Sequence, residues 1–276
     1  MQNIKDIGIL KSLRIEHVGE RICETCNAPV PIYQKDGEEI SKCMNCENIN
    51  LSTRETEGYE PPKRRSLVQR VKAIEYIPDE LEDVTFEDYV PKTGSQKQAK
   101  QLVLDFLKGD YKALLFQGDP GTGKSHLFRC AARELSKQKI NWEENGRIYQ
   151  VNKTVLFAKV PELMKLIQST YRNRNGLNEN TILKTITNAD VLILDEIAGE
   201  RSKADSVGFE TWSGDILYQI LDHRQGKANL YNLNYQSAEV KEKYGITHGK
   251  RILSRMSSQA KILKVEGPDH RMQGVD

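Results

Sequence analysis

The chain has 276 residues, of which 38% are hydrophobic, and this is enough for one large core and a smaller satellite domain. Its 41 lysines and arginines nearly balance its 39 aspartates and glutamates, so a formal net charge of +2 excludes a general attraction to nucleic acid or membranes and leaves only local patches. The amino-terminal stretch MQNIKDIGIL lacks the pattern of a secretion signal, and no apolar run approaches the roughly 20 residues of a membrane helix. We therefore expect a cytoplasmic protein with no membrane partner.

Four of the five cysteines form two closely spaced pairs near the amino terminus. The pairs are Cys23 with Cys26, and Cys43 with Cys46. Sixteen residues separate them, a spacing at which two thiolate-bearing knuckles close on one tetrahedral Zn²⁺. Such a site is structural, and the metal would supply the folding energy that a short segment lacks. Two redox-active pairs are the alternative, although no thioredoxin-like pattern surrounds them. His17 could substitute for one cysteine ligand, but we expect it to be a surface histidine. Cys130 is expected to be a small buried apolar residue.

The composition changes after this segment and predicts a domain boundary. We expect a zinc-binding domain over residues 1–50 that binds a partner. Residues 51–94 read as a linker and lead-in segment, because they begin with a polar stretch and contain the Pro-Pro-Lys-Arg-Arg-Ser run at 61–66. The remaining residues, 95–276, are expected to form a single domain.

In this larger domain strands and helices alternate, as they do in a parallel sheet with crossover helices. Ser95 is expected to cap a first helix that Gly109 ends. Strands are predicted at 113–117, 155–160, 191–194, 229–233 and 261–265, and helices at 124–137, from 161, at 179–187, around 215–224 and at 250–256. This order predicts an α/β fold whose parallel sheet is flanked by helices.

A phosphate-binding loop lies between the first strand and the helix that follows it. Residues Gly118-Asp119-Pro120-Gly121-Thr122-Gly123-Lys124-Ser125 match G-x-x-x-x-G-K-[ST] at every fixed position. Glycines let the loop wrap closely, so that backbone N–H groups and the following helix N-terminus face the phosphates. Lys124 is expected to reach the β- and γ-phosphates, and Ser125 to bind Mg²⁺. His126 is counted with the nucleotide-binding residues. The loop therefore predicts binding of ATP with Mg²⁺.

Two adjacent carboxylates follow the apolar strand Val191-Leu-Ile-Leu, at the edge of the sheet where the phosphates are expected. Asp195 is expected to hold the Mg²⁺ shell, and Glu196 to act as the general base that polarises the attacking water. Together with the P-loop they predict a P-loop ATPase.

These motifs resemble those of the DnaC-type replicative helicase loaders, a branch of the AAA+ ATPases of bacteria and their phages. The resemblance covers about Phe86 to Arg271. It includes the P-loop, the Thr85-Phe-Glu-Asp-Tyr segment, the run from Asp190 to Ile197 and the run from Leu217 to Arg224. It implies an AAA+ core without a full helical lid.

The resemblance also implies roles for residues outside the P-loop. In place of the family's Thr-Ser-Asn, this chain has Asn232-Leu-Asn234, so Asn234 resembles the polar sensor that positions water near the γ-phosphate. Arg255 resembles the finger offered to a neighbouring subunit's ATP, with Arg251 as the alternative. Arg271 is in the place of the second sensor.

The partners that the resemblance implies are a replicative hexameric DNA helicase, single-stranded DNA and other copies of this chain. The zinc segment fits a helicase grip, but it could equally bind DNA, with Lys63, Arg64 and Arg65 contacting phosphates. A transposition helper of the IstB type shares the same core motifs and is an alternative. A nucleotide-gated adaptor with negligible hydrolysis is another.

Overall fold

The computed structural model describes residues 15–55, 58–171, 177–200 and 211–270. Within these ranges no helix is long and apolar enough to cross a membrane. The chain divides into two compact units, and each is described by itself. The smaller unit contains Met1–Pro61 and Asn141–Val151, and the larger contains Pro62–Ile140 and Asn152–Asp276.

The smaller unit combines a small antiparallel sheet, a helix and a β-hairpin. Its elements are β1 (Ile15–Ile22), β2 (Pro29–Lys35), β3 (Glu38–Ile40), α2 (Met44–Glu55), and residues 141–151 of the hairpin formed by β5 (Lys139–Glu144) and β6 (Arg147–Asn152). The hairpin turns at Asn145-Gly146, and both residues have the positive φ that such two-residue turns require. In the smaller unit as a whole, few apolar side chains are buried, and Val18, Ile22 and Met44 are exposed. The unit therefore has little apolar core of its own.

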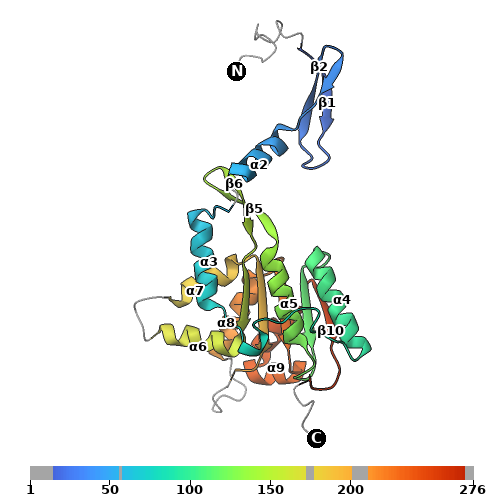
Figure 1. Ribbon diagram of the computed structural model, residues 1–276. Helices are drawn as coiled ribbons and strands as arrows, with labels where there is room; N and C mark the ends of the chain where they lie inside the picture. Colours follow the sequence, from blue (N-terminus) through green and yellow to red (C-terminus); the bar gives the residue numbers. More distant parts are fainter. Residues whose placement is uncertain (1–14, 56–57, 172–176, 201–210, 271–276) are drawn as a thin grey trace. The chain divides into compact units, whose positions relative to one another are not determined.

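The larger unit is built on a five-stranded parallel sheet (Figure 1). The strands are β4 (Ala113–Gln117), β7 (Val155–Lys159), β8 (Val191–Ile197), β9 (Ala228–Leu233) and β10 (Ala260–Lys264), in the order β10-β4-β9-β8-β7. The inner strands read as continuous apolar runs because both of their faces are covered. This confirms the α/β fold that the alternating pattern predicts.

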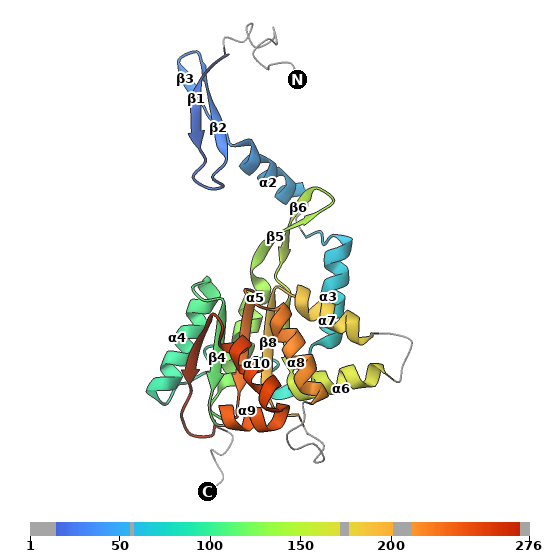
Figure 2. The same ribbon diagram turned by 180° about the vertical axis from the view of Figure 1, so that it is seen from behind.

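Helices cover both faces of this sheet (Figures 1 and 2). The helices are α3 (Pro62–Ile74), η2 (Asp79–Leu81), α4 (Gly94–Lys108), α5 (Lys124–Lys137), α6 (Val160–Thr170), α7 (Glu179–Asn188), α8 (Trp212–His223), α9 (Ser237–Tyr244) and α10 (Ile246–Ser257). On one face, α4 and α5 pack on alternate strand residues such as Phe116, Phe157 and Ile193. On the other face α6 packs on β7 and β8, and Figure 2 shows α8 and α10 side by side.

The cap of α4 differs from the prediction. Thr93, and not Ser95, is the N-cap, because its side chain accepts from the Gln96 backbone while the Gln96 side chain accepts from the Thr93 backbone. Ser95 instead donates to the Glu266 carbonyl at 2.8 Å. Gly109 ends the helix with φ of 94°, as expected.

The predicted linker contains a helix that belongs to the larger core. Pro62 is the first residue of α3, where the missing N–H has no cost, and Leu67, Val71 and Ile74 are buried at helical spacing. Arg64 is fully buried, so it is not available for a phosphate-binding patch. Its guanidinium donates to the Asn152 carbonyl and pairs with Asp190 at 2.6 Å.

Arg64→Ala is expected to lower the free energy of unfolding of the larger unit by about 3 kcal/mol, because it leaves Asp190 without its buried cation. Urea-induced unfolding followed by circular dichroism measures the change. Gln69→Ala, on an exposed position of the same helix, is the matched control and should change stability by less than about 0.5 kcal/mol. Equal stability of the two variants would contradict the importance of this ion pair.

Candidate functional site

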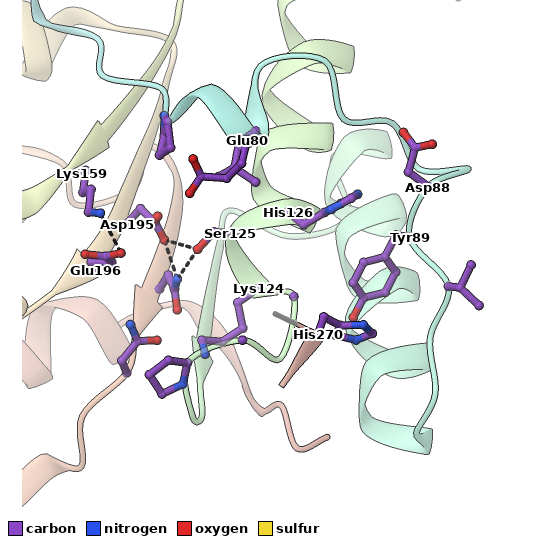
Figure 3. Close-up of a pocket in the computed structure, with 18 of the residues that line it drawn as sticks. Glu80, Asp88, Tyr89, Lys124, Ser125, His126, Lys159, Asp195, Glu196 and His270 are labelled. Carbon is purple, nitrogen blue, oxygen red and sulfur yellow. Dashed lines mark hydrogen bonds and ion pairs between the residues drawn. The ribbon is translucent and has the colours of Figure 1, made fainter. Parts of the chain in front are cut away.

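A pocket of about 680 Å³ lies at the carboxyl edge of the parallel sheet (Figure 3). It is lined by the P-loop, the ends of β7, β8 and β9, the segment before α4, and His270. Ligands of open α/β sheets bind at this edge, where loops and helix N-termini converge. The pocket therefore gathers the P-loop and the two predicted carboxylates in one place.

The P-loop has the conformation that its glycines allow. Gly121 and Gly123 have φ of 79° and 90°. A Cβ on Gly123 would lie 2.6 Å from the ring of Tyr89, so this loop and the Tyr89 ring are packed directly together. The ammonium group of Lys124 donates to the carbonyls of Gly118 and Asp119, both at 2.8 Å. A cation is thus held inside the loop, beside the N-terminus of α5, where an anion is favoured.

Three polar side chains from separate elements form one hydrogen-bonded group. Ser125 Oγ donates to Asp195 Oδ1 at 2.9 Å, and Asn232 Nδ2 donates to Ser125 Oγ at 3.0 Å and also to Asp195 Oδ1. Burial raises the pKa of Asp195, and the hydrogen bonds from Asn232 and Ser125 partly oppose this rise. Asn232 Oδ1 is buried without a partner among the described residues. A hydroxyl, a carboxylate and an amide oxygen are ligands that suit Mg²⁺, so the residues present fit that ion.

A β-bulge explains why both carboxylates reach the pocket. In a regular strand, adjacent side chains point to opposite faces. The register of β8 against β9 shifts between Leu194 and Ile197, so Asp195 and Glu196 together lie opposite Asn232. Glu196 has a φ of 51°, in the left-handed region that a non-glycine residue rarely adopts. Both carboxylates line the pocket as a result.

Lys159 is a residue of this site that the sequence analysis missed. It ends β7, and its ammonium group pairs with Glu196 Oε1 at 2.9 Å (Figure 3). Burial, the largest single effect, lowers the pKa of Lys159, but the hydrogen bond to Glu196 and the negative charges of Glu196 and Asp195 together outweigh it and raise that pKa. A lysine at a strand end carries no motif, so only the pairing of β7 with β8 reveals this contact.

Asn232 lies in β9 and Asn234 directly follows that strand, and the two asparagines have different surroundings. Asn234, the predicted sensor, lines the pocket. Asn232 is the asparagine that touches Ser125 and Asp195, and the sequence analysis assigned it no role. Asn232 is the residue before the last one of β9, so its place near the carboxyl end of a strand was the sequence feature that could have indicated a role in the site.

The carboxyl-terminal segment crosses the P-loop. The His270 backbone donates to the Gly121 carbonyl at 3.0 Å, and its ring lies 3.2 Å from the side chain of Gln96, which itself donates to the Thr122 carbonyl. The ring of His126 lies beside that of Tyr89, with centroids 5.6 Å apart, and both residues line the pocket. Arg271, the predicted second sensor, lies outside the described residues.

Arg255 does not line the pocket of its own chain among the described residues. It lies on α10 and pairs with Asp222 at 2.7 Å. A role in catalysis therefore requires the pocket of a neighbouring copy.

In the smaller unit the four cysteines form one cluster. The sulfur atoms of Cys23 and Cys46 are 3.7 Å apart, those of Cys26 and Cys43 are 3.5 Å apart, and all four lie within 4.8 Å of one another. A tetrahedral zinc site with Zn–S bonds of about 2.3 Å has S–S separations of about 3.8 Å, so the cluster fits Zn²⁺. Each close sulfur pair combines one cysteine of the Cys23–Cys26 motif with one of the Cys43–Cys46 motif, as a metal shared by both motifs requires.

The four thiols of the cluster affect one another's ionisation. Hydrogen bonds from the backbones of Cys26 and Thr25 lower the pKa of Cys23 to about 6. Contacts with the neighbouring sulfurs, first that of Cys26, raise the pKa of Cys46 to about 12. Four thiols at these distances cannot all ionise without a positive charge between them. By contrast, Cys130 is a buried residue of α5, as expected.

The parallel sheet, the P-loop and the carboxylates at the sheet edge define an α/β fold of the P-loop class. The sequence profile of the family described as ATPase family associated with various cellular activities (AAA) matches residues 114–238. This region contains the P-loop, both carboxylates and β9.

Within that class, the chain resembles the DnaC-type loaders. It is 29% identical over 198 residues to the replicative helicase loader DnaC of Buchnera aphidicola subsp. Baizongia pistaciae (strain Bp), covering 68% of this chain and 69% of that protein. It is 28% identical over 180 residues to DnaC of Escherichia coli (strain K12), covering 63% of each. The match therefore spans less than two thirds of the Escherichia coli protein.

The solved structures show the same fold. The crystal structure of DnaI has a TM-score of 0.51 and 20% identity, and covers 70% of this chain and 96% of that one. The replication initiator DnaA, bound to AMPPCP and single-stranded DNA, has a TM-score of 0.51 and 14% identity, and covers 70% of this chain and 52% of that one.

Metal analysis should find about one Zn²⁺ per chain after purification under reducing conditions, because the four sulfurs fit one tetrahedral ion. Cys43→Ser should lower the zinc content and weaken the remaining binding in a chelator competition. Cys130→Ala, which removes the cysteine outside the cluster, should keep the wild-type content. A metal-free wild type whose mass shows two disulfides would support redox pairs instead.

Proposed function

We propose that this chain is an ATP-dependent loader of a replicative hexameric DNA helicase. The observation that carries this proposal is the similarity to DnaC loaders, together with a pocket lined by Lys124, Ser125, Asp195 and Glu196. The fold alone does not distinguish a loader from other proteins of the AAA class.

The pocket supports binding of ATP with Mg²⁺. Residues 118–125 cradle the phosphates through backbone N–H groups, and Lys124 exchanges its contacts with loop carbonyls for the β- and γ-phosphates. Ser125 and Asp195 hold Mg²⁺, which neutralises charge on the phosphate oxygens. Asn232 fixes the orientation of both side chains through its amide group.

Hydrolysis uses the groups beside the γ-phosphate. Glu196 accepts a proton from the attacking water, and Asn234 orients that water. The resemblance to the loader family gives Arg271, which lies outside the described residues, the role of the second sensor. In the Lys159–Glu196 ion pair, Lys159 binds the carboxylate that would accept the proton. We therefore expect hydrolysis by the isolated chain to be slow.

Assembly completes the site. Arg255 reaches the nucleotide of a neighbouring copy, where its fixed charge stabilises the transferring phosphate. The active species is then an oligomer, and nucleotide state sets its affinity for helicase and single-stranded DNA. The zinc-stapled unit binds the helicase through its exposed apolar residues, among them Val18, Ile22 and Met44.

Unwinding by a cognate replicative helicase on a fork coated with single-strand-binding protein tests the loader function. The wild-type chain should stimulate unwinding, and Lys124→Ala should abolish the stimulation because it removes the phosphate-binding cation. Arg255→Ala should impair it while leaving ATP binding intact. ATP binding without any contact with or stimulation of the helicase would favour a transposition helper, and ATP binding with negligible turnover would favour an adaptor.

Lys159→Ala is expected to raise the basal ATP turnover about two- to fivefold, because a partly exposed ion pair of this kind is a modest restraint on the Glu196 carboxylate. Steady-state phosphate release at low chain concentration measures the effect. Lys165→Ala, which removes an exposed lysine paired with Glu162 on α6, is the control and should leave turnover unchanged. A fall in turnover, as in Glu196→Gln, would show that Lys159 assists hydrolysis.

A further inference from the structure

Two arginines of α10 pack on one aromatic ring of α8. The guanidinium carbons of Arg251 and Arg255 lie 5.6 Å and 5.9 Å from the ring centre of Tyr218. The arginines are one helical turn apart, so a single ring can contact both. Figure 2 shows the two helices side by side. Distances below about 6 Å are those of cation–π contacts.

Among the described residues, Arg255 also makes hydrogen bonds to α8 and to the turn after it, and Arg251 does not. Its Nε donates to Asp222 Oδ1 at 2.7 Å, and its backbone carbonyl accepts from Gln225 Nε2 at 3.1 Å. Asp222 accepts from Nε, so this carboxylate does not take the paired Nη atoms that bind phosphate oxygens as a fork. Among the described residues, no carboxylate pairs with Arg251.

The support comes from a rigid element. Tyr218 and Asp222 are one turn apart on α8, whose residues Leu217 and Leu221 are fully buried. The side chains of Arg255 and Asp222 are 38% and 44% exposed, so their pair contributes little to stability. Its effect is to hold a long, flexible side chain in one orientation, which lowers the entropy lost when that side chain binds a ligand.

We propose that Tyr218 and Asp222 are positioning residues that hold Arg255, and not Arg251, ready for the nucleotide of a neighbouring copy. This inference rests on the proposed trans role of Arg255. Asp222 accepts a hydrogen bond from Nε of Arg255, and the ring of Tyr218 packs against the guanidinium group. The two Nη atoms of Arg255 are then available to bind the phosphate. Arg251 shares the ring but has no carboxylate to orient it.

Steady-state ATP hydrolysis by the full chain, at a concentration where turnover per chain no longer rises, tests the assignment. Arg255→Ala should lower kcat at least about tenfold, because an arginine finger acts on the transferring phosphate. Tyr218→Ala and Asp222→Ala should each lower kcat about two- to fivefold with the KM for ATP unchanged, the effect expected of an exposed cation–π or ion-pair contact. Tyr218→Phe keeps the ring and should retain wild-type kcat, and so should Arg251→Ala.

Mixing variants separates positioning from a structural defect. A Lys124→Ala chain cannot use ATP but still offers an intact Arg255. Added to Asp222→Ala chains, it should raise their turnover towards the wild-type value, because its arginine serves their intact pockets. A lesion inside the pocket of the Asp222→Ala chain would not be rescued in this way.

The outcomes distinguish this inference from the proposed function. Wild-type kcat in Arg255→Ala would overturn the trans arginine and the positioning role together. A lowered kcat in Arg255→Ala with wild-type kcat in both Tyr218→Ala and Asp222→Ala would overturn only the positioning role. A lowered kcat in Asp222→Ala without rescue by Lys124→Ala chains would also overturn it. Since Asp222 is exposed, its variant remains informative even if Tyr218→Ala fails to fold.

Discussion

The hydrogen bonds among Ser125, Asp195 and Asn232 join the P-loop helix to the two central strands, and the rest of the nucleotide site depends on them. Asp195 is almost fully buried, so its carboxylate needs these donors in the absence of a cation. The same contacts hold the β8 bulge in register with β9, and the bulge turns Glu196 into the pocket. One polar group thus sets the positions of the proposed metal ligands and of the proposed base.

Buried arginines hold the opposite end of the sheet. Arg224 is fully buried, and its guanidinium donates to Asn229 Oδ1 at 2.8 Å and to the carbonyls of Ala189 and Ala228. Burial lowers its pKa to about 10, which leaves it charged at neutral pH. Arg224 is the last residue of the run from Leu217 to Arg224 that resembles the loader family. Its role in this structure is to hold neighbouring segments together through buried hydrogen bonds. Together with Arg64 it anchors the starts of β8 and β9, so the carboxyl ends of these strands can carry strained, polar residues.

The proposed activity depends on two ion pairs with different roles. Glu196 is paired with Lys159, and Arg255 is paired with Asp222. The Lys159–Glu196 pair is partly exposed and therefore weak, so nucleotide binding can exchange it at little cost. The Asp222 pair, in contrast, is proposed to persist and to keep Arg255 oriented.

Local patterns were sufficient for the α/β class, the P-loop, the Asp195–Glu196 pair and the four-cysteine cluster, because each depends on spacing within a few residues or on one strand and the helix after it. Residues 62–74 look like a linker by their prolines and charges, yet they form α3. Its fully buried Arg64 pairs with Asp190, which is 126 residues away and partly exposed. Asn232, Lys159, Tyr218 and Asp222 carry no motif, and the two ion pairs and the hydrogen-bonded group exist only once strands and helices distant in sequence are packed together. The amino-acid sequence by itself therefore determined which chemistry the chain carries, and the tertiary structure decided which side chains orient and restrain it, because the order of strands in a parallel sheet is set by packing across the whole domain.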